Sequence, residues 1–156
     1  MYKPTLFKQL GFKQLGCSVL LLLATAACAN PPTEQQARAL FSLQTLNIGG
    51  ITTVVQVADT AEKRAQGLMF QQTAKPGMLL LYQQPAAISL WMRNTTMPLD
   101  VAFIGPDWTI MHIEPLQPLD ETTVAANSEV IAALEMPQGW FAAKQIQPGA
   151  TVKLIE

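Results

Sequence analysis

Two acids embedded in apolar segments are the groups of this chain best suited to chemistry. Asp100 and Glu135 each lie between two large apolar neighbours. A carboxylate in such a segment must find cationic or hydrogen-bonding partners, or else stay protonated. Two carboxyl groups that meet could also act as general acid and base. A small periplasmic hydrolase or lyase that uses Asp100 and Glu135 is therefore one alternative for the function.

Arginine is the partner that best suits a partly buried carboxylate, because its planar guanidinium matches the two oxygens. Arg64 lies near the end of a segment with helical character. We predict that Arg64 lies within salt-bridge distance of at least one of the two acids. Such a network could fix the helix onto a sheet, or it could line a pocket that receives a small polar ligand. The candidate ligand-binding residues are Arg64, Trp91, Arg93, Asn94, Asp100 and Glu135.

Methionine suggests a second alternative, since soft thioethers with an imidazole are what a periplasmic Cu(I) site would use. The methionines at 69, 78, 92, 97, 111 and 136 lie in or beside the segments just named, and His112 is the single histidine. No Met-x-Met or Met-x-x-Met spacing occurs, and methionine also fills irregular gaps in a core. The core interpretation is favoured. We expect no resident metal or cofactor, and we favour a binding or accessory module over an enzyme.

The first 28 residues are typical of an export signal. Three lysines and no acid lie in the first 16 residues, and a short apolar run follows, from Cys17 to Ala27. The run is too short to span a bilayer. The segment Thr25-Ala26-Ala27-Cys28 resembles a bacterial lipobox, although an aliphatic residue usually stands at the position of Thr25. That resemblance implies cleavage before Cys28 and lipid attachment to it, with residues 1–27 removed as signal peptide.

The expected location is the periplasm, with the protein held at a membrane through lipid on Cys28. Ala29 and Asn30 offer no acidic signal for retention at the inner membrane, so the outer membrane is favoured. Ordinary signal-peptidase cleavage, which would leave a soluble periplasmic protein, is the alternative. Residues 28–40 are polar and contain two prolines, which is typical of a tether.

Composition excludes several partners for the part that remains after cleavage. Residues 28–156 carry seven basic and eleven acidic side chains, so their net charge is −4. With no cluster of Lys or Arg, we expect no nucleic-acid partner. The expected partners are the membrane, a small polar ligand and a periplasmic protein. Residues 41–156 are enough for a single domain with its own core.

Short alternating or β-branched runs, separated by turn residues, predict a mainly β domain. We expect a compact antiparallel sandwich or open barrel with one or two short helices. Asp59 and Glu62 are typical of a capping box for a helix over residues 60–66, which Gly67 would end. A further short helix is expected within residues 137–144. The expected strands cover residues 41–46, 51–58, 78–82, 88–92, 101–104, 108–113, 130–136 and 151–155.

A set of short strings resembles an uncharacterised family known as domain of unknown function 192. The strings are Arg64 before Gly67-Leu68-Met69, Gly77-Met78-Leu79, Trp91-Met92-Arg93-Asn94-Thr95, Pro98-Leu99-Asp100 and Leu134-Glu135. The resemblance covers about residues 50–155. It implies a compact β-rich fold and brings no activity with it, so function has to be argued from the site.

Overall fold

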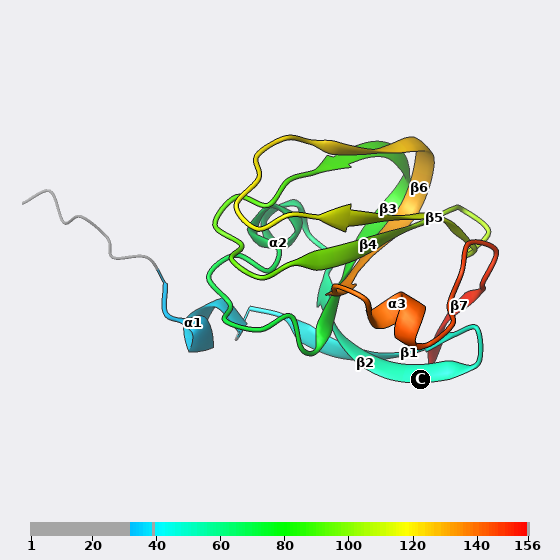
Figure 1. The fold of residues 1–156 in the computed structure, drawn as a ribbon, viewed down its shortest axis with the longest axis horizontal. Coiled ribbons are helices and arrows are strands. Elements are labelled where there is room, and N and C mark those ends of the chain that lie inside the picture. The colour runs from blue at the N-terminus through cyan, green and yellow to red at the C-terminus, as the bar shows by residue number, and fades with distance from the viewer. Residues whose placement is uncertain (1–31, 39, 156) are drawn as a thin grey trace, which may run out of the picture. The chain divides into compact units, whose positions relative to one another are not determined.

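The computed structural model describes residues 32–38 and 40–155, which form a domain built on one seven-stranded sheet (Figure 1). The strands are β1 (Ser42–Ile48), β2 (Ile51–Ala58), β3 (Gly77–Leu90), β4 (Leu99–Ile104), β5 (Ile110–Leu116), β6 (Val124–Pro137) and β7 (Val152–Ile155). The helices are α1 (Glu34–Arg38), α2 (Ala61–Gln66) and α3 (Trp140–Ala143). The predicted signal peptide and Cys28 lie outside the described residues. No helix of the described part is long and apolar enough to cross a membrane.

The strand order is β5-β4-β6-β3-β2-β1-β7. β2 and β3 are parallel, and the other neighbouring pairs are antiparallel. The edges of the sheet approach each other where Thr109 forms an isolated bridge with Thr151. Beside it, the amide of Val152 donates to the carbonyl of Trp108 at 2.8 Å. The described residues contain seven strands and three short helices, so the predicted mainly β class is confirmed. The sheet is open.

The first hairpin forms where the sequence predicts it. β1 and β2 pair along their length up to Ile48 opposite Ile51. Between them, Gly49 and Gly50 have φ values of 56° and 91°, which glycine adopts without the steric cost of a Cβ. The turn chemistry of this segment therefore fixes the register of the first strands.

The helix α2 begins one residue later than its sequence signal indicates. Thr60, in an extended conformation, is the N-cap, and its side chain accepts from the amide of Lys63 at 3.2 Å. The predicted cap, Asp59, instead forms an ion pair with the Lys63 ammonium at 2.7 Å. A hydroxyl and a carboxylate cap about equally well, so the neighbouring pair could not be ranked from the sequence. The helix ends at Gly67, as predicted.

β3 is a single long strand, whereas the sequence indicates separate strands over 78–82 and 88–92. The polar segment around Gln83 and Gln84 stays in the strand because β6, equally long, pairs with both halves of β3. The pairing shifts register between Leu81 and Ala86. Tertiary pairing thus overrides the local polarity that predicts a turn.

The central strands are buried on both faces, and this divides the core in two. The first core cluster contains Met78, Leu80, Val101, Phe103 and Ala133, among others. The second core cluster contains Leu79, Ala102, Ile104, Leu134 and Phe141, among others. Since successive side chains of a strand point to opposite faces, the clusters lie on the two sides of β3, β4 and β6. Neighbouring residues of these strands therefore serve different sides of the domain.

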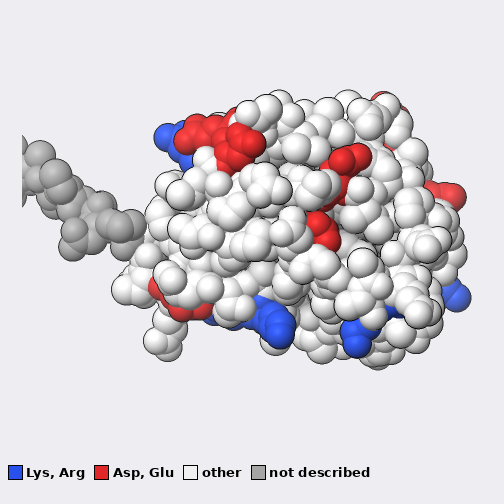
Figure 2. All heavy atoms as spheres, in the orientation of Figure 1, with Lys and Arg blue, Asp and Glu red and all other residues white. Residues whose placement is uncertain are grey.

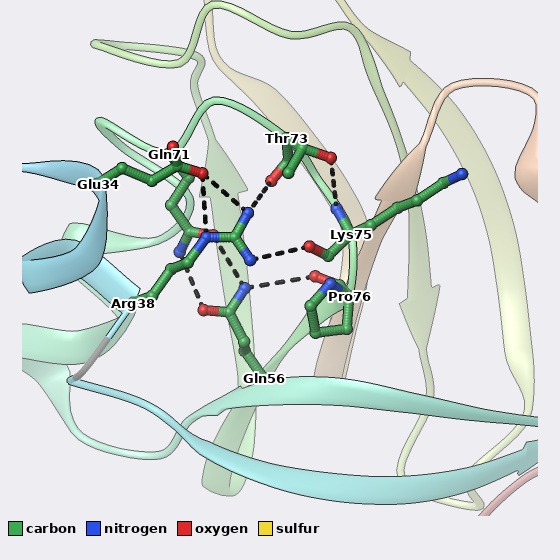
Figure 3. Close-up of polar contacts among 7 residues, drawn as sticks. All are labelled: Glu34, Arg38, Gln56, Gln71, Thr73, Lys75 and Pro76. Carbon is green, nitrogen blue, oxygen red and sulfur yellow. Dashed lines mark hydrogen bonds and ion pairs between the residues drawn. The ribbon is translucent and has the colours of Figure 1, made fainter.

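Helix α1, which falls within the predicted tether, packs on the domain through the contacts shown in Figure 3. Ala37 is fully buried, and Arg38 reaches from α1 to the loop before β3. Its guanidinium donates to the carbonyls of Thr73 at 3.1 Å and Lys75 at 2.9 Å. Glu34 pairs with the same guanidinium at 3.1 Å. Segment 34–38 is thus part of the folded domain.

Beneath α1, two buried glutamines join the loop to the sheet (Figure 3). The side-chain amides of Gln56 on β2 and Gln71 donate to each other's oxygens at 3.0 Å. Gln56 also donates to the carbonyl of Pro76 at 3.3 Å. A reciprocal pair of this kind satisfies polar groups that would be costly to bury alone. It holds the segment between α2 and β3 against the sheet.

Candidate functional site

A cavity of about 300 Å³ lies between α2 and the side of the sheet that carries the first core cluster. We refer to it as the α2 cavity. Its polar lining comes from Arg64, Gln66, Tyr82, Ser89, Thr95 and Glu135, and its apolar lining includes Leu68, Met69, Leu80, Leu90 and Trp91. Five parts of the chain therefore meet here: α2, the residues just after it, β3, the segment after β3, and β6.

Glu135 is the most unusual group of the α2 cavity. It lies on β6 opposite Met78 of β3 and Val101 of β4, at the centre of the sheet. The residue is 6% exposed, and its Oε2 atom has no hydrogen-bond partner among the described residues. Burial raises the pKa of Glu135 to about 7, because a charged carboxylate loses its hydration there. Near neutral pH this carboxyl can therefore both donate and accept a proton.

Arg64 lies on the helix side of the same cavity. Its Nη1 atom donates to the carbonyls of Asp59 at 3.0 Å and Leu81 at 2.8 Å. The guanidinium carbon lies 4.4 Å from the centre of the Tyr82 ring, which is a cation–π contact. The carbonyls and the ring thus hold the guanidinium in place.

The predicted ion pair of Arg64 with an acid is wrong for the described residues. Neither Asp100 nor Glu135 comes within 4.0 Å of its nitrogens, and the ion pairs found there join other residues. The reason is that backbone carbonyls of the helix entry and of β3 satisfy the guanidinium first. Sequence patterns of charged residues do not report such main-chain acceptors.

Asp100 is separated from Glu135 by the sheet itself. In the pairing of β4 with β6, Asp100 lies opposite Met136 and Val101 lies opposite Glu135. The two acids therefore point to opposite faces. Asp100 lines a different hollow, next to α3, and its Oδ2 atom accepts from the amide of Gly139 at 2.7 Å. The two carboxyl groups cannot act on one substrate, which removes the geometric basis of the hydrolase or lyase alternative.

The segment after β3 contributes two residues, Trp91 and Thr95, to the α2 cavity. Trp91 lines it while remaining 43% exposed, so the indole forms part of the rim. Met92 is buried in the first core cluster and anchors the segment. Thr95, only 4% exposed, also lines the cavity. Its hydroxyl donates to the carbonyl of Arg93 at 3.3 Å.

Arg93 and Asn94 do not line the α2 cavity. The Arg93 guanidinium lies 5.4 Å from the Trp91 ring centre and 4.0 Å from the Glu121 carboxylate. Asn94 has a φ of 53°, and its carbonyl accepts from the amide of Phe70 at 3.1 Å. Its role is thus to shape the loop, because asparagine tolerates this left-handed conformation.

A family model settles what this chain is related to. The model for DUF192, described as "Uncharacterized ACR", matches residues 44–154. The chain belongs to the DUF192 family. No curated protein matches it.

Two solved structures are similar to this DUF192 domain. One, from Sinorhizobium meliloti 1021 and described as a candidate transcription regulator, has 29% sequence identity and a TM-score of 0.69 over 73% of this chain and 95% of that chain. The other is a protein of unknown function from Novosphingobium aromaticivorans DSM 12444. It has 32% identity and a TM-score of 0.69 over 81% of this chain and 94% of that chain.

Most of the strings that resemble DUF192 in the sequence converge on the α2 cavity. Arg64 and the segment Gly67-Leu68-Met69 form the helix side, Trp91 and Thr95 form the rim, and Glu135 lies at the sheet. Gly77 supports the site from behind. A Cβ on Gly77 would lie 2.5 Å from the carbonyl oxygen of Glu135 and would also meet the Met136 side chain. Glycine is required there so that β3 can pass Glu135 closely.

Sequence reasoning missed Gln66, Tyr82 and Ser89 of the α2 cavity and left Thr95 outside its candidates. Tyr82 could have been found, because alternation along β3 puts it on the same face as Met78 and Leu80. Ser89 could not, since it follows the register shift between Ala87 and Ser89.

The methionines of the domain do not gather around His112. Met78 and Met92 belong to the first core cluster, Met136 to the second, and Met111 is 42% exposed. The His112 ring stacks on Phe103 with ring centres 4.6 Å apart. In the described part of the chain, no three His, Cys, Asp or Glu side chains are grouped so as to hold a metal ion.

The charged side chains of the DUF192 domain are sparse on the face shown in Figure 2. Acidic groups form small separate patches there, and Lys and Arg lie mainly along the lower edge of the view. This face therefore presents no continuous basic surface.

Proposed function

We propose that this DUF192 protein is an exported, lipid-anchored periplasmic binding module that takes a small polar ligand in the α2 cavity. The observation that carries the proposal is the Glu135 carboxyl, which is buried in the cavity wall with Oε2 lacking a partner. Buried polar groups in native proteins are almost always hydrogen-bonded, and a ligand would supply the missing bond. The bound ligand could in turn be presented to a periplasmic protein partner.

The geometry favours binding over a purely structural role for the same residues. A structural network would bring Arg64 and Glu135 together so that each satisfies the other. Instead, both line one cavity without forming an ion pair. Their charges therefore remain available to a third group, and a convergent set of polar side chains in a hollow is typical of ligand sites.

A compound screen tests the binding proposal. We expect at least one small polar compound to raise the melting temperature of the purified domain, because a ligand of the folded state stabilises it by RT ln(1 + [L]/Kd). At a concentration of 100 times Kd this is about 2.7 kcal/mol. The Glu135→Gln variant should lose most of the shift. A compound that stabilises both forms equally would place its site elsewhere, and a broad screen without any stabiliser would contradict the proposal.

A second experiment tests the anchor, which we infer from the first 28 residues. The Cys28→Ser variant should lack lipid and leave the membrane fraction in a carbonate wash, whereas the parent should stay, because acyl chains supply the membrane affinity. Thiol labelling of the denatured parent is the control: lipid on Cys28 would leave the mature chain with no free thiol. If the variant fractionates like the parent, the proposed anchor is wrong.

A further inference from the structure

The α2 cavity holds one positive and one ionisable acidic group on separate walls. Arg64 comes from α2 and Glu135 from β6, and both line the same space of about 300 Å³. They form no ion pair, and Arg64 is fixed where it lies by the carbonyls of Asp59 and Leu81 and by the Tyr82 ring. To form an ion pair with Glu135, Arg64 would have to give up these contacts. The cavity is thus preorganised with its opposite charges apart.

The backbone carbonyls that bind Arg64 leave its Nε and Nη2 atoms for other acceptors. Both of its hydrogen bonds to backbone carbonyls use Nη1. The N–H groups of Nε and Nη2 lie on the other edge, which is one of those that bind a carboxylate with two parallel hydrogen bonds. In a ligand complex, these two N–H groups are the donors of Arg64 that suit a carboxylate.

Glu135 requires a positively charged donor, whereas Arg64 requires an anionic acceptor. Its Oε2 atom lacks a donor among the described residues, and the carboxyl is flanked by apolar side chains of the neighbouring strands, Met78 and Val101. An ammonium group is the ligand feature that best satisfies such a group, because it supplies both the missing hydrogen bond and the missing positive charge.

Resting on the proposed function, we infer that the ligand of the α2 cavity is a small zwitterion of the amino-acid type. Its ammonium group binds the Glu135 carboxylate, and its carboxylate binds the free edge of the Arg64 guanidinium. At about 30 Å³ for each water, a cavity of about 300 Å³ holds on the order of ten waters, which matches a compact molecule. The exposed Trp91 at the rim would cover the side chain of the ligand.

The pH dependence of binding follows from the groups that face Glu135. Arg64 from α2 and Tyr82 from β3 are the other titratable side chains lining the cavity, while β4 presents Val101 and the segment after β3 presents Trp91 and Thr95. Burial raises the pKa of Glu135 to about 7. An acid of that pKa is about 9% ionised at pH 6 and about 91% at pH 8, so affinity for an ammonium ligand should rise about tenfold.

The test is calorimetric titration of the full mature chain with matched probes at pH 6 and pH 8. Alanine and serine carry both charges, N-acetylalanine lacks the ammonium, ethylamine lacks the carboxylate, and glucose is a neutral polyol. We expect a zwitterion to bind and each singly charged analogue to bind at least tenfold more weakly. The Glu135→Gln variant should bind the zwitterion at least tenfold more weakly and lose the rise with pH.

Asp100→Asn provides the matched control, because it removes the other embedded acid from the opposite face of the sheet. It should bind like the parent. If glucose or a singly charged analogue binds the parent as well as alanine does, and Glu135→Gln abolishes that binding, the cavity is a ligand site but the zwitterion is wrong. If no probe binds while another compound of the screen does, the zwitterion is also wrong. If nothing binds in either experiment, the binding function itself fails.

Discussion

The Glu135→Gln variant should gain stability over the parent as the pH rises. The difference between their free energies of unfolding, variant minus parent, should be about 3 kcal/mol larger at pH 8 than at pH 4. Burial raises the pKa of this carboxyl from 4.5 to about 7. A raised folded-state pKa means that the folded chain holds the proton more tightly than the unfolded chain. The parent therefore loses stability as the pH rises from about 4.5 through 7. Each pKa unit corresponds to about 1.4 kcal/mol, and glutamine does not titrate.

Urea denaturation of both proteins at pH 4, 6 and 8 measures this difference. The two proteins share all their other titrating groups. The relevant quantity is therefore how the difference between their free energies of unfolding changes with pH. Glu135→Leu is the companion variant: it should show the same pH trend if titration is the cause, whatever the amide of glutamine does. A difference that stays constant over this range would mean that Glu135 ionises without penalty, and that a cation compensates it in solution.

Gly77→Ala should be the most damaging single-methyl change in the domain, lowering the free energy of unfolding by about 3 kcal/mol or more. The new Cβ would lie 2.5 Å from the carbonyl oxygen of Glu135, which belongs to the backbone of the neighbouring strand. Backbone cannot move aside as a side chain does, so β3 and β6 would have to separate. Thermal and urea unfolding measure the loss.

Gly105→Ala is the matched control for that loss. Its Cβ would lie 3.1 Å from the Asp107 carboxylate and 3.2 Å from the Met111 sulfur, both of which are side-chain atoms rather than backbone. The variant should therefore stay within about 1 kcal/mol of the parent. Equal losses at Gly77 and Gly105 would show that the close passage of β3 past Glu135 does not limit stability.

The sequence predicted the parts of this fold that turn residues and helix-capping residues determine. The hairpin over β1 and β2 follows from Gly49 and Gly50, and the end of α2 follows from Gly67. The choice of Thr60 over Asp59 as N-cap did not follow, because both side chains can cap a helix. The union of two expected strands into β3 depends on a distant partner, β6, whose pairing no local pattern reports.

The candidate site shows the same division. Arg64, Trp91 and Glu135, three of the candidate residues, line one cavity. Asp100 looked equivalent to Glu135, since both acids lie among apolar neighbours. Which face each acid takes depends on the register of β4 against β6, where Asp100 lies opposite Met136. A shift of one residue would have put both acids on the same face, and the sequence does not specify that register by itself.

The pairing of β1 with β7 joins two strands that are neighbours in the sheet and far apart in the sequence. The register runs from Thr45 opposite Ile155 to Ile48 opposite Val152, so the sheet is incomplete until β7 has been synthesised. Pairing between such distant segments also slows folding, because the loop between them must close first. Assembly of the complete sheet is thus delayed until β7 is available to pair with β1.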